Sequence, residues 1–122
     1  MVTIVTNVEL KEGVDRKWDA VMGSRMTGAK KRQGWVGGQL LRSEERPRRR
    51  VIIGTWKTRA DWELWHKDPR FAETRRQLDG LVTGPEEHWW HDVVLDVRKG
   101  GTRRAPAAPK RAGKRSSKRR SR

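Results

Sequence analysis

The sequence of 122 residues contains no cysteine and no tyrosine, and Phe71 is its only phenylalanine. Without cysteine the chain can form no disulfide, no thiolate nucleophile and no Cys-ligated zinc or iron–sulfur centre. Without tyrosine it lacks one of the groups that commonly transfer protons in enzymes. The N-terminus has neither a basic segment nor a long apolar run, so we expect no signal peptide, no membrane span and a cytoplasmic location.

Three enzyme motifs are also missing: the nucleophile elbow, the P-loop and the glycine fingerprint of dinucleotide-binding proteins. Gly37 and Gly38 lie within an expected strand, where glycine is more typical of a close approach by a partner or ligand than of a phosphate cradle. No group of His, Asp and Glu has the spacing of metal ligands. Hydrolase and nucleotide-dependent functions therefore have no support, and we predict no metal site.

Acidic residues are absent from residues 98–122, although this segment holds twelve of the thirty lysines and arginines. Residues 1–97 form one mildly basic domain, and most of the net charge of +15 comes from the segment that follows it. From Gly100 onward nothing is more apolar than alanine, so we expect a disordered tail.

Such a tail either keeps the protein in solution or binds polyanions such as nucleic acid without reading sequence, because it carries no aromatic side chains for base stacking. The cations that would make these contacts are Arg103, Arg104, Lys110, Arg111, Lys114, Arg115, Lys118, Arg119 and Arg120.

The domain itself shows clear hydrophobic periodicity. Apolar residues alternate with polar ones where strands are expected, and recur every three or four residues where helices are expected. In chain order the pattern predicts a strand over 2–10, a helix over 14–31, strands over 34–42 and 50–56, helices over 58–66 and 68–82, and a strand over 88–97.

The predicted order β-α-β-β-α-β is that of the α+β, ferredoxin-like fold, in which helices cover one face of an antiparallel sheet. The other face also carries apolar residues on several strands. Because the chain is too short for a second helical layer, we predict a homodimer formed through the two sheets.

The stretch GWVGGQLLRSEERPRRRVIIGTWKTRADWELWHKDPRF, with VVLDV in the last strand, resembles the antibiotic biosynthesis monooxygenase (ABM) family over residues 2–97. Members of that family are dimeric α+β barrels of ferredoxin-like subunits. One branch binds and degrades haem, using an Asn on the first strand, a Trp on the short helix and a His on the second helix as iron ligand. Another branch oxidises electron-rich aromatic polyketides to quinones without a metal or an organic cofactor.

The resemblance assigns roles to particular residues of this chain. The helical tryptophan falls on Trp65. The first-strand asparagine falls on Asn7 or, when the chain is counted from Gly13, on Thr6, and these neighbours face opposite sides of a strand. The basic residue that approaches an anionic ligand falls on Arg25, and the iron-ligating histidine falls on Thr74, where this chain offers no imidazole.

Each of these positions also has a purely structural explanation. Trp65 is either a core residue or the wall of a pocket for a flat aromatic ligand. His66 follows it directly, about 100° further around the helix, so we expect His66 to face away from that pocket. Arg25, on the apolar side of its helix, either pairs with an acid or presents a cation to a ligand.

His88 and His91 are three residues apart on the last strand and should project to opposite faces, so they cannot share a metal. His91 has the same face as Trp89 and Val93, and we assign it either to a core or interface contact or to the pocket as proton acceptor.

The resulting prediction is a monooxygenase that oxidises a flat, electron-rich aromatic with dioxygen and without a metal. Its catalytic residues would be Asn7, Trp65 and His91, and its substrate-binding residues Arg25, Thr6 and Thr74. Two alternatives remain: a haem-binding or haem-degrading monooxygenase, and a non-catalytic ligand-binding dimer whose basic tail associates with nucleic acid.

Overall fold

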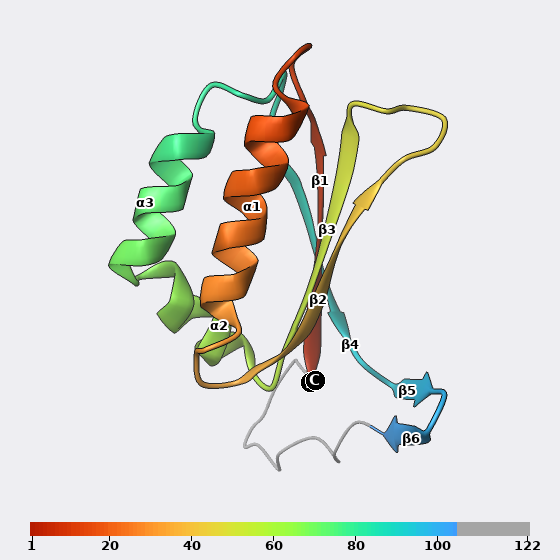
Figure 1. The fold of residues 1–122 in the computed structure, drawn as a ribbon. Coiled ribbons are helices and arrows are strands. Elements are labelled where there is room, and N and C mark those ends of the chain that lie inside the picture. The colour runs from red at the N-terminus through yellow and green to blue at the C-terminus, as the bar shows by residue number, and fades with distance from the viewer. Residues whose placement is uncertain (105–122) are drawn as a thin grey trace.

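The computed structural model describes the backbone of residues 1–104 and the side chains of residues 1–100. Four strands form one antiparallel sheet in the order β2-β3-β1-β4, and helices cover one of its faces (Figure 1). The α+β, ferredoxin-like arrangement predicted from the sequence is confirmed. In chain order the elements are β1 (Val2–Glu9), α1 (Asp15–Ala29), β2 (Trp35–Arg42), β3 (Arg49–Trp56), α2 (Arg59–His66), α3 (Pro69–Leu78) and β4 (Glu87–Asp92).

The helices α2 and α3 begin where the sequence predicts. Thr58 Oγ1 accepts a hydrogen bond from the backbone N–H of Asp61 at 3.1 Å, which caps α2. Asp68 caps α3 by accepting from the backbone N–H of Arg70 at 2.8 Å, directly before the proline at the first helical position. The helix α3 ends at Leu78, earlier than the expected residue 82, and Gly80 follows with a φ of +81°.

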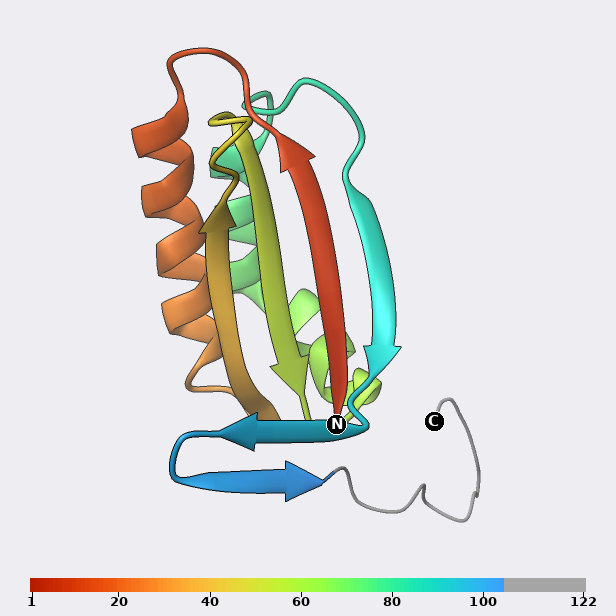
Figure 2. The same ribbon diagram turned by 90° about the vertical axis from the view of Figure 1, so that its right-hand side faces the viewer.

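The last expected strand, 88–97, is divided in the structure. Val2 pairs with Asp92 and the N–H of Val93 donates to the carbonyl of Met1, so β4 leaves the sheet where β1 begins. The chain then turns away and forms a separate hairpin of β5 (Leu95–Arg98) and β6 (Gly101–Arg104), which crosses the foot of the sheet in Figure 2.

This hairpin differs from the expectation of disorder from Gly100 onward, because the backbone of residues 101–104 forms β6. The expected polyanion-binding residues Arg103 and Arg104 are in that strand. Those from Lys110 to Arg120 lie outside the described residues, as does the remainder of the expected tail.

The core consists of two groups of buried side chains between the sheet and the helices. One group is formed by Val8, Leu10, Trp18 and Met22, and the other by Ala29, Trp56, Trp65 and Phe71. Apolar side chains alternate along β1, where Ile4, Thr6 and Val8 are buried and their neighbours are only half-buried. The helix-facing side of β1 therefore holds Thr6, and the opposite side holds Asn7.

Figure 2 looks onto the face of the sheet that carries no helix. Val5 pairs with Ile53 on one side and with Trp89 on the other, and Leu41 pairs with Val51. Trp89 is 55% exposed and Leu41 is 42% exposed. Among the described residues, none of the helices combines the length and the apolar character that a membrane span would need.

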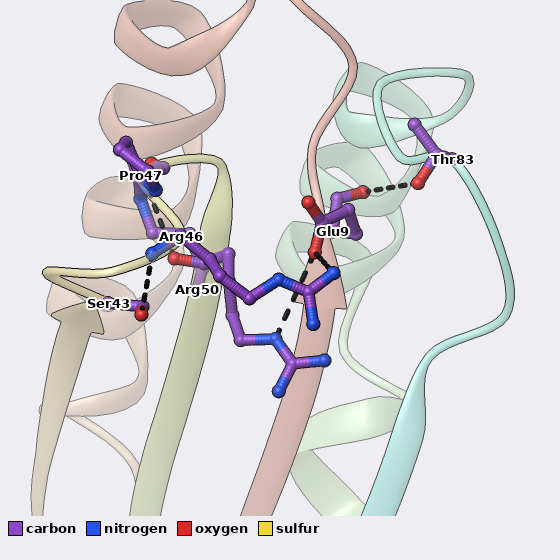
Figure 3. Close-up of polar contacts among 7 residues, drawn as sticks. Glu9, Ser43, Arg46, Pro47, Arg50 and Thr83 are labelled. Atoms are coloured by element: carbon purple, nitrogen blue, oxygen red, sulfur yellow. Dashed lines mark hydrogen bonds and ion pairs between the residues drawn. The ribbon is translucent and has the colours of Figure 1, made fainter.

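Polar contacts connect the elements at the end of the sheet where β1 stops and β3 begins (Figure 3). Glu9 on β1 accepts hydrogen bonds from Arg46 of the β2–β3 loop at 3.4 Å and, through its carbonyl, from the backbone N–H of Thr83 at 2.8 Å. Beside them, the guanidinium of Arg50 donates to the Pro47 carbonyl at 2.7 Å and to the Asp19 carboxylate at 2.8 Å. These contacts attach α1, β1 and the β2–β3 loop to one another.

Candidate active site

A pocket of about 560 Å³ lies between the sheet and the helices, in the size range of small-molecule sites. Its lining is rich in tryptophan, since six of the seven tryptophans of the chain line it. These are Trp18, Trp35, Trp56, Trp62, Trp65 and Trp90.

Trp65 both packs in the core and lines the pocket, so the two interpretations of this residue are compatible. Its side chain is 4% exposed, and its ring meets Phe71 edge-on at 5.8 Å between centroids. Gly28 of α1 lies so close that a Cβ added there would be 3.3 Å from Cη2 of the indole. The glycine therefore lets α1 approach α2 and fixes the position of Trp65.

His66 also lines the pocket, so the expectation that it faces away is wrong. Trp62, one helical turn earlier, stacks on His66 at 3.6 Å between centroids, and Phe71 stacks on it at 3.9 Å. The sequence contains a signal for this contact, because residues four apart on a helix lie on the same side of it. The pocket reaches both this stripe of α2 and the neighbouring stripe that carries Trp65.

The charge state of His66 follows from its surroundings. Nδ1 of His66 lies 3.0 Å from the carbonyl oxygen of Trp62, which can only accept, so Nδ1 carries the proton. The pKa of His66 is lowered to about 4, mainly by burial and in part by the nearby cations Arg25 and Arg75, against the opposing effect of the hydrogen bond to Trp62. Near neutral pH the ring is therefore an uncharged imidazole.

Arg25 lines the pocket and bonds to Thr74, which is buried and is not among the lining residues, so the expected contact of Thr74 with a substrate is not found. Arg25 Nε donates to Thr74 Oγ1 at 2.8 Å, and the hydroxyl of Thr74 donates to the carbonyl of Phe71 at 2.8 Å. The guanidinium of Arg25 lies 4.0 Å from the centroid of the Phe71 ring, and that of Arg75 lies 5.1 Å from it. Two cations thus converge on one aromatic ring.

The guanidinium of Arg25 has no ion pair with a carboxylate among the described residues. Burial lowers its pKa to about 10, Glu86 raises it and Arg75 lowers it. A half-buried cation without a paired acid favours an anionic ligand, because a bound anion restores the interactions that burial removed. Arg75 also lines the pocket and was not found from the sequence.

The structure distinguishes between Thr6 and Asn7. Thr6 is 8% exposed and lines the pocket, whereas Asn7 lies on the opposite face of the sheet, where it pairs with Glu87 and Val51. The count from Gly13, which favours Thr6, is therefore the one that matches the structure. Asn7 is not placed where it could take the catalytic role expected of it.

His91 is likewise on the outer face, so its expected place at the pocket is wrong. His88 pairs with Thr6 and Trp90 pairs with Ile4 on the pocket side, while His91 pairs with Thr3 on the outer side. His91 was assigned to the pocket because one strand was expected over 88–97, in which His91 shares a face with the apolar residues from Val93 to residue 97. Those residues follow the end of β4, so they give no information on its faces.

His88, rather than His91, reaches the pocket residues. Its Nδ1 lies 3.0 Å from Thr6 Oγ1, and its Nε2 lies 3.4 Å from Glu86 Oε1. As the sequence predicts, the two histidines of β4 project to opposite faces. In residues 1–100, no three His, Asp or Glu side chains are grouped so that they could hold a metal ion.

The fold and the pocket together define a ferredoxin-like α+β protein with a tryptophan-lined pocket between its sheet and its helices. The family model described as "Antibiotic biosynthesis monooxygenase" matches residues 1–77, and the chain belongs to that family. The match covers β1 to α3 and stops before β4, which carries His88 and Trp90. No protein with a curated description matches the sequence.

Solved structures share the fold at low sequence identity. SnoaB, a cofactor-independent oxygenase from Streptomyces nogalater, is 22% identical with a TM-score of 0.68, covering 75% of this chain and 91% of its own. Rv0793 from Mycobacterium tuberculosis is 14% identical with a TM-score of 0.69, covering 82% and 98%. A conserved protein from Methanosarcina mazei is 14% identical with a TM-score of 0.70, covering 74% and 89%.

Proposed function

We propose that this protein is a monooxygenase that oxidises a flat, electron-rich aromatic with dioxygen, using no metal or organic cofactor. The observation that carries the proposal is a pocket lined by six tryptophans and by Arg25, a half-buried cation that forms no ion pair with a carboxylate of the described residues. Membership of the ABM family agrees with it, and SnoaB, which shares the fold, is a cofactor-independent oxygenase.

The chemistry needs little from the protein beyond orientation and charge stabilisation. Loss of a proton turns an electron-rich phenol or anthrone into an anion that can pass electrons to O₂. When a ring CH₂ becomes a carbonyl, the product keeps one oxygen atom, the other leaves as water, and the substrate supplies all the electrons. The protein has to hold the ring, exclude water and favour the anion.

The proposed roles follow from the geometry. Trp65 and the other indoles hold the ring by stacking, and Arg25 and Arg75 stabilise the anion. Thr74 acts through Arg25, whose Nε it holds at 2.8 Å. Thr6 reaches a substrate oxygen from β1, while the uncharged His66 adds a hydrogen-bond acceptor to the same pocket.

Anthralin, a three-ring phenolic anthrone, is a suitable probe for this activity. We expect purified protein to raise both the O₂ uptake measured with an electrode and the quinone absorbance above the uncatalysed rate. Arg25→Met should lower kcat/KM by about 10-fold, as expected for the loss of one charge contact. His91→Gln, on the outer face, serves as the matched control. Uptake that never exceeds the protein-free rate with anthralin or with simple naphthols would contradict the proposal.

The haem alternative loses support because the position of the iron ligand, residue 74, carries no histidine. Haem iron is bound by His, Cys, Met or Tyr, whereas Thr74 offers a hydroxyl that already bonds both Arg25 and the carbonyl of Phe71. His66 stacks between the rings of Trp62 and Phe71, and its Nδ1 donates to the carbonyl of Trp62. Its Nε2 keeps a lone pair, at a position of the chain that differs from the one the haem branch uses. A saturable Soret shift on titration with hemin, weakened by Arg25→Ala, would reopen this alternative.

We further propose that the protein is a homodimer joined through the helix-free faces of its sheets. Trp89, which is 55% exposed, and Leu41 lie on that face with Val5, and Leu95 and Val97 of β5 are exposed beside it. Burying such a patch is favourable at about 25 cal/mol per Å². Trp89→Glu should convert dimer to monomer in sedimentation velocity, and a wild-type chain that sediments as a monomer at all concentrations would contradict the dimer.

A further inference from the structure

Thr6, His88 and Glu86 form a continuous polar chain from the floor of the pocket to the surface. Thr6 is 8% exposed, whereas the side chains of His88 and Glu86 are 47% and 42% exposed. Thr6 Oγ1 is 3.0 Å from Nδ1 of His88, and Glu86 Oε1 is 3.4 Å from Nε2. All three residues line the pocket, so a bound substrate can contact the buried end of the chain.

The direction of the hydrogen bonds follows from the chemistry of the groups. An ionised carboxylate can only accept, so its position beside Nε2 favours the tautomer with the proton on Nε2. Nδ1 is then a lone-pair acceptor, and the hydroxyl of Thr6 donates to it. Because Thr6 donates through its O–H, the lone pairs of Oγ1 remain available to accept a proton from a ligand in the pocket.

We propose that Thr6, His88 and Glu86 carry the substrate proton out of the pocket, with His88 as the final acceptor. This inference rests on the proposed oxygenase function, which needs an anionic substrate. The O–H bond of an enol or phenol breaks as its proton moves to Thr6 Oγ1, and the original hydroxyl proton of Thr6 moves to Nδ1 of His88. No electrons are exchanged in this step.

After the transfer, the substrate oxygen is an anion that accepts a hydrogen bond from Thr6. His88 has become an imidazolium, whose charge the carboxylate of Glu86 offsets at 3.4 Å. Because the ring is half-exposed, His88 can return the proton to water and be ready for the next substrate. Thr6 touches the substrate, whereas Glu86 acts through His88 and is a positioning residue.

Other charged groups around the pocket favour the same outcome. From α1 and α3, Arg25 and Arg75 favour an anion, and from α2 His66, which is uncharged near neutral pH, adds no charge that would oppose protonation of His88. His66 itself is a poor acceptor, since its pKa of about 4 keeps the proton off Nε2 near neutrality. Glu86 is the acidic group that faces His88, and it also raises the pKa of Arg25.

Alizarin is the probe for this step, because it is a flat hydroxyanthraquinone that is already oxidised and changes colour when its phenol ionises. A titration of the bound dye with pH, followed by absorbance, reports the transfer without turnover. In the wild type we expect ionisation at a lower pH than for the free dye. Thr6→Val and His88→Gln should each raise the midpoint by about one pH unit, and Glu86→Gln by less.

Two matched variants separate the proposed path from general damage to the site. Thr6→Ser keeps the hydroxyl and should leave the midpoint near that of the wild type. His91→Gln changes the other histidine of β4, which lies on the opposite face, and should have no effect. Equal midpoints in wild type, Thr6→Val and His88→Gln would overturn the inference.

A kinetic measurement tests the same path during turnover of anthralin. His88→Gln should lower kcat by about a hundred-fold near neutral pH with little change in KM. Most of this loss should be recovered at high pH, where the substrate ionises without help, and a structural defect would not be recovered in this way. A pH-independent loss would overturn the proposed proton path.

The outcomes also distinguish the inference from the proposed function. If alizarin binds and anthralin is oxidised, but the variants behave like wild type, the proton path is wrong and the oxygenase function stands. If alizarin does not bind to the wild type, the aromatic pocket does not hold such a ligand, and both proposals are contradicted.

Discussion

Arg25 and Arg50 line two different pockets of the protein, and the surroundings of the two side chains differ. Arg50 is 1% exposed and is held by the carboxylates of Asp15 and Asp19 and by the carbonyl of Pro47. Among the described residues, no aromatic side chain lines the pocket at Arg50, whereas six tryptophans line the pocket at Arg25.

The pKa values of the two arginines move in opposite directions. Hydrogen bonding to Asp19 raises the pKa of Arg50 against its burial, while burial lowers the pKa of Arg25 to about 10. A buried cation whose partners come from the fold contributes to stability, and one left without an acid is available to a ligand. We therefore assign a structural role to Arg50 and propose a ligand-binding role for Arg25.

The largest effect should follow from replacing the structural arginine. Arg50→Met removes the hydrogen bonds to Asp15, Asp19 and Pro47 and leaves the two carboxylates without their cation. We expect the free energy of unfolding to fall by about 3 kcal/mol, measured by urea denaturation. Alizarin affinity per folded molecule should not change, because the pocket lies elsewhere. A loss below about 1 kcal/mol would show that the carboxylates do not need this partner.

The next effect concerns His66 and the dependence of stability on pH. Its folded pKa of about 4 lies below its ordinary value of 6.5, so the unfolded chain binds a proton more readily than the folded one. The contribution of His66 to stability is therefore complete above pH 6.5 and is lost as the pH falls through 4.

We expect this acid-dependent loss to be about 2 kcal/mol, discounted for the solvent that still reaches the ring. Urea denaturation of wild type and His66→Gln across that range measures it, and the variant should show a smaller slope. Arg75→Met should reduce the slope in part, because Arg75 is one of the cations that lower the pKa of His66. Parallel curves for wild type and His66→Gln would contradict the assignment.

Much of this arrangement could be predicted from the sequence, because it depends on local rules. The order of elements follows from hydrophobic period, and the starts of α2 and α3 follow from the capping residues Thr58 and Asp68. Trp65 and Arg25 were expected at one pocket, and both line it. Thr74 was expected there too, but it bonds to Arg25 and is not among the residues that line the pocket.

The errors concern which side of an element faces the core. Both faces of β4 carry bulky side chains. The period-two pattern therefore cannot show whether Trp89 and His91 or His88 and Trp90 face the core. The choice depends on pairing with β1, a long-range contact that leaves no local signal. The error for His66 came from the assumption that only the side of α2 that carries Trp65 faces the pocket. The neighbouring side, which carries Trp62 and His66, faces it as well.

A smaller effect is expected for the binding arginine. Arg25→Met should lower the affinity for ionised alizarin by about 10-fold and leave the un-ionised dye almost unaffected. Stability should change by less than about 1 kcal/mol, because no carboxylate loses a partner. Arg25→Lys keeps the charge but not the Nε–H bond to Thr74, and comparison of the two variants separates charge from geometry.

The smallest effect is expected for Arg32, which has an acidic partner but remains in contact with water. Its guanidinium lies 2.8 Å from Asp68, and its side chain is 34% exposed. Arg32→Met should therefore cost about 0.5 kcal/mol, and less in high salt. Asp68 keeps its second role in this variant, since its carboxylate still caps α3 through the N–H of Arg70. Asp68→Asn is the matched variant, because asparagine can cap a helix but cannot pair with the arginine. If either change cost as much as Arg50→Met, then pairing alone, and not pairing combined with burial, would decide which arginines stabilise this fold.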